Sequence, residues 1–236
     1  MVEYEKREWG AYSVLNRPDF SDYLVHFTAD RAPCSTQSKI PVDKFTEMSA
    51  YDKLISILHA KEICASRMPR TGAAAVCFTE CPWSSLLSHT KVYSPYGIGF
   101  GKPLIFSRDG APALYVRWDT YNNQKWDKHI LPYVTPFWPS YRPKSLGNHY
   151  QTCDYSHERE WRIPHHFSFE YDQIKFVVLD TYEDMAKFPK ELKDEIGREK
   201  FLLMDNYRTI EKLWPVHIID SQLSSTGSES EPPDAK

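Results

Sequence analysis

The sequence predicts a single α+β domain, and its length, composition and residue patterns support that prediction. A chain of 236 residues is long enough for one substantial core. Hydrophobic residues make up 41% and charged residues 26% of the chain, which is usual for a globular protein and excludes collagen-like, disordered and disulfide-scaffold classes. We place one domain over residues 1–220 and a disordered Ser/Glu/Pro-rich tail over 221–236.

Runs of β-forming residues, separated by helix patterns, predict the core elements. The expected strands cover 23–28, 74–79, 96–100, 113–116, 160–163, 176–180 and 217–219. The expected helices cover 49–60, 102–108 and most of 182–213, with Pro189 restarting the last one. Residues 117–156 lack periodicity and carry several prolines, so they form a long aromatic-rich insertion with one helix at most.

Charge and cysteine content narrow the class of protein further. The net charge of −3 excludes a basic field over the whole chain, so any surface that binds anions must be local. Five cysteines, an odd number, and a charged N-terminal segment predict a reduced, cytoplasmic protein without a membrane span. Cys77 and Cys81 have poor spacing for zinc, so we expect no metal site.

Two strand segments carry polar side chains at alternate positions. An extended strand would place Glu158, Glu160 and Arg162 on one face. Two convergent carboxylates can hold a ribose hydroxyl and stabilise an oxocarbenium-like transition state, although a solvated strand with salt bridges explains the same pattern. His26 and Thr28 likewise share a face of the first expected strand, where both side chains could form hydrogen bonds with a ribose or a carboxamide.

The order of these motifs resembles two groups of proteins. The opening segments, His26-Phe27-Thr28, 54–58 and 63–66, are similar to those of the DNA ADP-ribosyltransferase DarT group. The later segments, 77–82, 96–102, 110–116 and 158–162, are similar to those of AbiGi-like abortive-infection proteins of phage defence. The likeness spans residues 23–165.

The resemblance implies an ADP-ribosyltransferase-like split β-sheet with flanking helices, and NAD bound as the cofactor between the halves of the sheet. It implies that His26, Phe27 and Thr28 contact NAD and that Tyr96 stacks on the nicotinamide. It also implies an arginine at the cofactor, either Arg67 or Arg70. The implied catalytic carboxylate is Glu160, assisted by Glu158.

The insertion offers a candidate substrate surface. Nine aromatic residues lie between Tyr115 and Tyr150, interleaved with five basic residues against two acidic ones. Aromatic and basic side chains in this mixture are typical of a groove for single-stranded nucleic acid, and an aromatic mini-core is the alternative. The candidate substrate-binding residues are Trp126, Trp138, Tyr141 and Arg162.

Together these features lead to the expectation of an ADP-ribosyltransferase toxin of an anti-phage or toxin–antitoxin system, acting on RNA or single-stranded DNA. An ADP-ribosyltransferase acting on a protein target and a non-catalytic antitoxin or regulatory binding module are the alternatives. A metal-dependent nuclease is disfavoured because the sequence shows no compact acidic cluster. A toxin of this kind would also need a cognate antitoxin partner.

Overall fold

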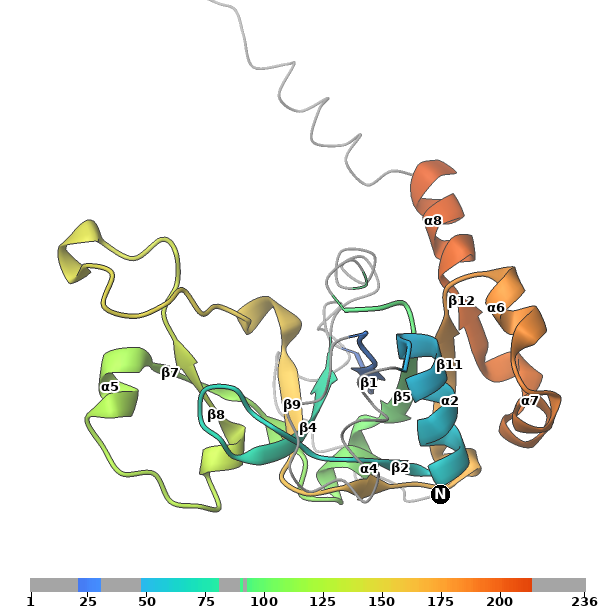
Figure 1. Ribbon diagram of the computed structural model, residues 1–236, viewed down its shortest axis with the longest axis horizontal. Helices are drawn as coiled ribbons and strands as arrows, with labels where there is room; N and C mark the ends of the chain where they lie inside the picture. The colour runs from blue at the N-terminus through green and yellow to red at the C-terminus, as the bar shows by residue number, and fades with distance from the viewer. Residues whose placement is uncertain (1–20, 31–47, 81–89, 91–92, 214–236) are drawn as a thin grey trace, which may run out of the picture.

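The computed structural model describes residues 21–30, 48–80, 90 and 93–213, and its centre is a mixed β-sheet (Figure 1). The strands follow the hydrogen-bonded order β12-β11-β5-β1-β4-β9-β6, and β3 pairs with β4 beside this path. The bounds of these strands are β1 Tyr23–Phe27, β3 Ser66–Arg67, β4 Ala74–Thr79, β5 Gly97–Gly101, β6 Ala111–Pro112, β9 Glu160–Ile163, β11 Ile174–Leu179 and β12 Phe201–Leu203. Neighbouring strands are antiparallel except for β11 and β12, which are parallel.

Two smaller sheets and a set of short helices surround this centre. The smaller sheets pair β2 Glu62–Ile63 with β10 Phe167–Ser168, and β7 Leu114–Arg117 with β8 Val134–Phe137. The α-helices are α2 Ala50–Ala60, α4 Lys102–Phe106, α5 Trp118–Asn122, α6 Tyr182–Lys187, α7 Lys190–Ile196 and α8 Met204–Leu213. The 3-10 turns are Leu131–Tyr133, Lys144–Leu146, Ser156–Glu158, Tyr171–Gln173 and Arg198–Lys200.

Peripheral elements gather at the two ends of the sheet (Figure 1). Helices α6, α7 and α8 lie at the end formed by β11 and β12, whereas β7, α5 and β8 lie beyond β9. We call residues 114–155, which contain β7, α5 and β8, the lobe. None of the helices in the described part of the chain has the length and apolarity that crossing a bilayer requires.

Local sequence explains why α2 forms where it does. The Ser49 hydroxyl accepts a hydrogen bond from the backbone N–H of Asp52, which satisfies a donor that the first turn leaves unpaired. Leu54 and Leu58 lie four residues apart and both are fully buried against the sheet. The helix predicted over 49–60 is therefore confirmed, with Ser49 as its cap.

The glycines of β5 allow a close approach across the sheet. A Cβ atom at Gly99 would lie 2.4 Å from the ring of Phe176 on the neighbouring strand β11. Because no real Cβ tolerates that distance, glycine is needed for the Phe176 ring to lie flat against β5. Ile98 and Phe100 alternate with these glycines and are fully buried on the opposite face.

Both faces of the sheet carry apolar side chains, and strand register decides which face each residue occupies. Val25 pairs with Thr79, and Thr79 pairs with Glu160, so these three side chains share one face. That face also carries a small core cluster of Val25, Phe176, Val178 and Met204. The opposite face carries the main core, in which the largest fully buried side chains include Phe78 and Phe100, packed against α2 and α7.

The class of fold and most core strands agree with the sequence analysis. The α+β prediction is confirmed, whereas the ADP-ribosyltransferase-like split β-sheet is not, because the path from β12 to β6 is continuous through the described strands. The prediction that 182–213 is mostly helical missed β12, which pairs with β11 in parallel register. The insertion predicted over 117–156 contains β8 in addition to helix α5. The expected strand at 217–219 and the expected tail at 221–236 lie outside the described residues.

Candidate functional site

The most densely bonded polar centre in the described chain lies on β9, around the guanidinium group of Arg162. Its Nε donates to Glu160 Oε1 at 3.0 Å, and its Nη2 donates to Glu160 Oε2 at 2.7 Å and to Thr135 Oγ1 at 2.6 Å. Its Nη1 donates to the backbone carbonyls of Pro132 at 3.1 Å and Val134 at 3.0 Å. These contacts use all five N–H donors that a guanidinium possesses.

This centre fastens the lobe to the central sheet and holds its charges in a dry environment. The side chains of Arg162 and Glu160 are only 6% and 11% exposed. Burial opposes the charge on Arg162, but the hydrogen bonds and the attraction from Glu160 outweigh it and raise the pKa of Arg162. The shared face predicted for Glu160 and Arg162 is confirmed, and both oxygens of Glu160 are bonded to Arg162.

Groups beside this centre are held in their neutral forms. Burial raises the pKa of the Cys77 thiol well above its usual value, and the nearby charge of Glu160 raises it further. Burial, followed by the charges of Glu160 and Glu158, likewise raises the pKa of Tyr115. Because the thiolate is the nucleophilic form of cysteine, Cys77 has the environment of a structural thiol.

Glu158 does not lie in the strand, contrary to the sequence analysis. It ends the 3-10 turn Ser156–Glu158, and Arg159 then adopts a left-handed backbone conformation with φ of 46° before β9 begins at Glu160. This turn breaks the alternation that an extended strand would impose on Glu158 and Glu160. Glu158 is 8% exposed, and its carboxylate accepts a hydrogen bond from the Tyr93 hydroxyl at 2.7 Å.

His26 lies on the opposite face of the sheet from Glu160. It follows Val25, whose side chain shares the face of Glu160, and its ring packs edge-on against Phe78 of the main core at 5.9 Å. The carbonyl of Cys77 lies 2.9 Å from Nδ1 and can only accept, so Nδ1 carries the proton. Burial lowers the pKa of His26, which keeps the ring neutral. The structure therefore does not bring His26 and Glu160 into one cleft.

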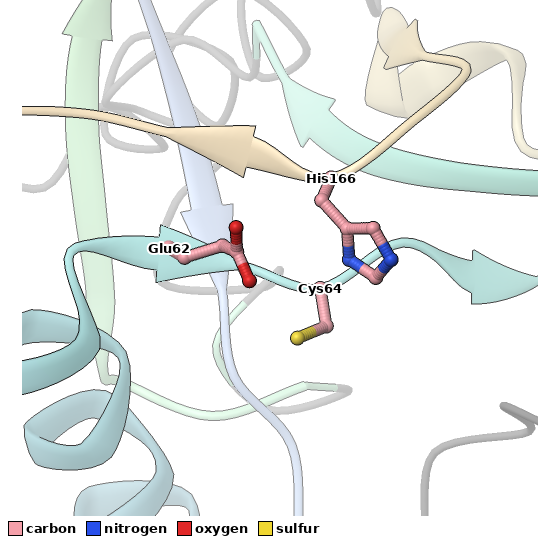
Figure 2. A group of neighbouring side chains, drawn as sticks. All are labelled: Glu62, Cys64 and His166. Atoms are coloured by element: carbon pink, nitrogen blue, oxygen red, sulfur yellow. The ribbon is translucent and has the colours of Figure 1, made fainter. Parts of the chain in front are cut away.

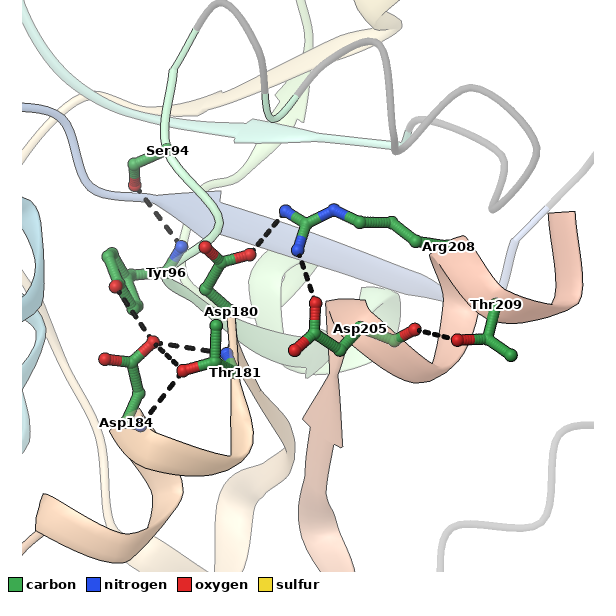
Figure 3. Close-up of polar contacts among 8 residues, drawn as sticks. All are labelled: Ser94, Tyr96, Asp180, Thr181, Asp184, Asp205, Arg208 and Thr209. Atoms are coloured by element: carbon green, nitrogen blue, oxygen red, sulfur yellow. Dashed lines mark hydrogen bonds and ion pairs between the residues drawn. The ribbon is translucent and has the colours of Figure 1, made fainter. Parts of the chain in front are cut away.

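The other residues implied to contact NAD have contacts inside the protein. Thr28 is 4% exposed, and its hydroxyl donates to the Ala50 carbonyl at 2.8 Å at the start of α2. Phe27 lies beside Gly97, where an added Cβ would come within 2.8 Å of its ring. The Tyr96 hydroxyl donates to Asp184 of α6 at 3.1 Å (Figure 3), and burial, then the charge of Asp184, raises its pKa.

The two candidate arginines lie in different surroundings. Arg67 is exposed on β3, where it pairs with Ala74. Arg70 lies 4.8 Å from the ring of Trp118 in the lobe, so it forms a cation–π contact there. Of the two, Arg70 is thus the one that meets the aromatic insertion.

Aromatic rings of the lobe pack mainly on one another. Trp118 stacks on Tyr150 at 5.3 Å, and Trp138 meets the same Tyr150 edge-on at 5.1 Å. Trp126 stacks on Tyr121 at 5.6 Å, and its indole N–H donates to the Tyr121 carbonyl. This packing supports the mini-core alternative for Trp126 and Trp138. Tyr141 is 76% exposed, whereas the fourth candidate, Arg162, is buried with all its donors bonded inside the protein.

A group that the sequence analysis missed lies at the small sheet of β2 and β10. Glu62, Cys64 and His166 each place one possible metal-ligand atom within 4.8 Å of the others (Figure 2). Glu62 and Cys64 are two residues apart, but His166 is about a hundred residues away in sequence, so no local spacing could have revealed the group. The expectation that the chain has no metal site rested on the spacing of Cys77 and Cys81, and neither residue belongs to this group.

Residues 54–136 match the model of a family described as "putative abortive phage resistance protein AbiGi, antitoxin". The match runs from the middle of α2 to β8 and covers less than half of the chain. It supports the resemblance to abortive-infection proteins, whereas the resemblance to DarT and the ADP-ribosyltransferase fold are not confirmed. Neither the curated proteins nor the solved structures contain a match to the chain.

This match contradicts the predicted function. An ADP-ribosyltransferase toxin that modifies nucleic acid is wrong as the main prediction, because the matched family is described as an antitoxin. The alternative of a non-catalytic antitoxin or regulatory binding module agrees better with that description. The use of NAD as a cofactor stays a prediction, which neither the match nor the described geometry tests.

Proposed function

We propose that this chain is an antitoxin-type regulatory protein that acts by binding its cognate toxin rather than by catalysis. The observation that carries the proposal is the match of residues 54–136 to a family described as an antitoxin of abortive phage resistance. The geometry of β9 supports it, because Arg162 occupies both oxygens of Glu160, the carboxylate expected to catalyse. Arg162 in turn fastens the lobe to β9 through its hydrogen bonds to Pro132, Val134 and Thr135.

The lobe is the surface that we propose for partner contact. Half of the eight large hydrophobic side chains that are exposed among the described residues belong to the lobe, and the cores of protein interfaces are enriched in apolar and aromatic side chains. They are Leu114, Ile130, Tyr141 and Tyr155, which are 48%, 46%, 76% and 41% exposed. Lys125, Lys128 and Lys144 are exposed in the same segment, so the complementary partner surface is apolar with an acidic rim.

Co-expression tests the proposal. The chain is produced together with the protein encoded by the adjacent reading frame, and growth and co-purification are measured. We expect the wild-type chain to restore growth when that protein is toxic and to co-purify with it in fixed stoichiometry. Failure to restore growth and to co-purify contradicts the antitoxin assignment.

Matched variants locate the contact. Ile130→Asp and Tyr141→Asp place a charge on the lobe, whereas Tyr182→Asp places the same charge on α6, where Tyr182 is 62% exposed. We expect protection and co-purification to weaken by about tenfold or more for the lobe variants, since buried aromatic or apolar anchors carry most interface energy. Equal weakening by Tyr182→Asp contradicts the placement on the lobe.

A separate experiment tests whether the chain catalyses ADP-ribosyl transfer. Purified chain is incubated with labelled NAD in the presence of RNA, single-stranded DNA or protein from a cell lysate. Transfer of label at multiple turnovers contradicts a purely binding role, and Glu160→Gln then shows whether the reaction depends on β9.

A further inference from the structure

Strand pairing brings Glu62, Cys64 and His166 together at the small sheet formed by β2 and β10. Phe167 pairs with Ile63 and Ser168 pairs with Glu62 in antiparallel register, which places His166 opposite Cys64. Ile63 is 2% exposed and turns into the core, so the residues on either side of it turn away from the core together. Figure 2 shows the carboxylate of Glu62 and the ring of His166 facing each other, with the thiol of Cys64 below them, so that the three groups form a triangle.

The three groups have the ligand chemistry of a transition metal. One possible ligand atom from each lies within 4.8 Å of the other two. Thiolate, imidazole and carboxylate are the side chains that bind Zn²⁺, whereas Ca²⁺ and Mg²⁺ prefer oxygen ligands alone. We propose that Glu62, Cys64 and His166 bind one divalent transition-metal ion of the Zn²⁺ class, with the fourth tetrahedral position open to solvent or to a ligand.

The distances fit a site that contracts slightly on binding. Zinc bonds of about 2.0–2.3 Å arranged tetrahedrally place neighbouring ligand atoms about 3.5 Å apart. The three ligand atoms, which lie within 4.8 Å of one another, therefore need to approach by at most about 1.3 Å. Glu62 and Cys64 are partly buried and His166 is exposed, so rotation of the side chains supplies this movement without displacing the core.

Hydrogen bonds around the group orient the Glu62 carboxylate and occupy one ring nitrogen of His166. The Ser168 hydroxyl donates to Glu62 Oε2 at 3.1 Å and orients the carboxylate, as outer partners of metal ligands commonly do. The backbone N–H of Ala65 donates to His166 Nδ1 at 3.3 Å, so this nitrogen carries no proton and its lone pair already accepts a hydrogen bond. At that length the bond is weak, and a metal ion competes with it readily.

Bound metal would link two segments that are distant in sequence. It would join the residues that follow α2 to the residues that follow β9, whose Arg162 fastens the lobe. The site shares no residue with the Arg162 centre and does not depend on the antitoxin assignment.

Metal titration of the full chain tests the proposal. The protein is stripped with a chelator, and binding of Zn²⁺ is measured by calorimetry, with Co²⁺ as a spectroscopic probe. We expect one equivalent of metal per chain, a thiolate-to-cobalt charge-transfer band with tetrahedral ligand-field bands, and a higher melting temperature on adding Zn²⁺. Cys64→Ser and His166→Asn should each weaken binding by more than about 100-fold, and Ser168→Ala by about tenfold.

Matched controls separate this site from adventitious binding. Cys153→Ser removes a buried thiol in the lobe. His165→Asn removes the neighbouring imidazole, whose ring nitrogens lie near Asp109 and the backbone carbonyl of His166 rather than near the three ligand groups. Both controls should keep wild-type affinity and the charge-transfer band. Cys34 and Cys81 lie outside the described residues and stay in every variant, so metal held by them would persist in Cys64→Ser. Equal affinity of Cys64→Ser and wild type, or no stoichiometric metal in the wild type, overturns the proposal.

Discussion

Two arginines fasten peripheral elements to opposite ends of the central sheet, and they do so in different environments. Arg162 joins the lobe to β9 with its side chain 6% exposed. Arg208 joins α8 to the end of β11 through Asp180, and also pairs with Asp205, with its side chain 38% exposed (Figure 3). Water screens the ion pairs of Arg208 but not the ion pair of Arg162. The two arginines should therefore contribute very different amounts to the free energy of unfolding.

The largest effect is expected at the buried arginine. Arg162→Met leaves the Glu160 carboxylate buried without its partner and frees the Pro132 and Val134 carbonyls. We expect the free energy of unfolding to fall by about 3–5 kcal/mol, as when one partner of a buried ion pair is removed. Urea denaturation followed by circular dichroism measures this change.

A double substitution shows where that loss originates. Arg162→Met combined with Glu160→Leu removes both charges, so we expect it to recover much of the stability lost by Arg162→Met alone. If the single substitution costs less than about 1 kcal/mol, the contrast between the two arginines is wrong.

A smaller effect, dependent on pH, is expected from His26. Burial lowers the pKa of His26 below its ordinary value of 6.5, so the unfolded chain takes up a proton that the folded chain does not. Stability should therefore fall as the pH drops below 6.5, with a slope of up to about 1.4 kcal/mol per pH unit from this residue.

The matched variant for this titration is His26→Asn, whose amide N–H can still donate toward the Cys77 carbonyl. Urea denaturation of both proteins between pH 5 and 7.5 isolates the contribution of His26, because the remaining groups titrate in both. Parallel stability curves over that range would show that His26 titrates normally.

The smallest effect is expected at the exposed arginine. Arg208→Met removes the ion pairs with Asp180 and Asp205, which are partly exposed to water. We expect a loss of about 0.2–1 kcal/mol, decreasing further in high salt. Urea denaturation at low and high salt measures it, and a loss comparable to that of Arg162→Met would remove burial as the deciding factor.

Elements with strong local patterns could be predicted from the sequence. The apolar spacing of Leu54 and Leu58 and the cap at Ser49 predict α2. Ile98 and Phe100, β-forming residues at alternate positions, predict β5. β12 could not be predicted in this way. Its three residues, Phe201–Leu203, form a strand because they pair with β11, and that pairing leaves no period in the local sequence.

The positions of the polar residues, too, could be predicted only where they follow from a local pattern. The common face of Glu160 and Arg162 follows from alternation in a strand and is found in the structure. The left-handed conformation of Arg159 excludes Glu158 from that alternation, because β9 begins only at Glu160. Arginine carries no sequence signal for this conformation. The group at Glu62, Cys64 and His166 depends on strand pairing across the molecule, so only the folded chain brings it together.

The contacts of Arg162 also bear on cooperativity. The backbone carbonyls of Pro132 and Val134 are bonded to a side chain on β9, thirty residues or so further along the chain. Opening the lobe alone would break the hydrogen bonds from the Arg162 guanidinium group to Pro132, Val134 and Thr135, so we expect opening of the lobe to cost more free energy than opening of α8. Amide hydrogens of β8 and β9 should then exchange in one cooperative unit, while those of α8 exchange through smaller, independent openings.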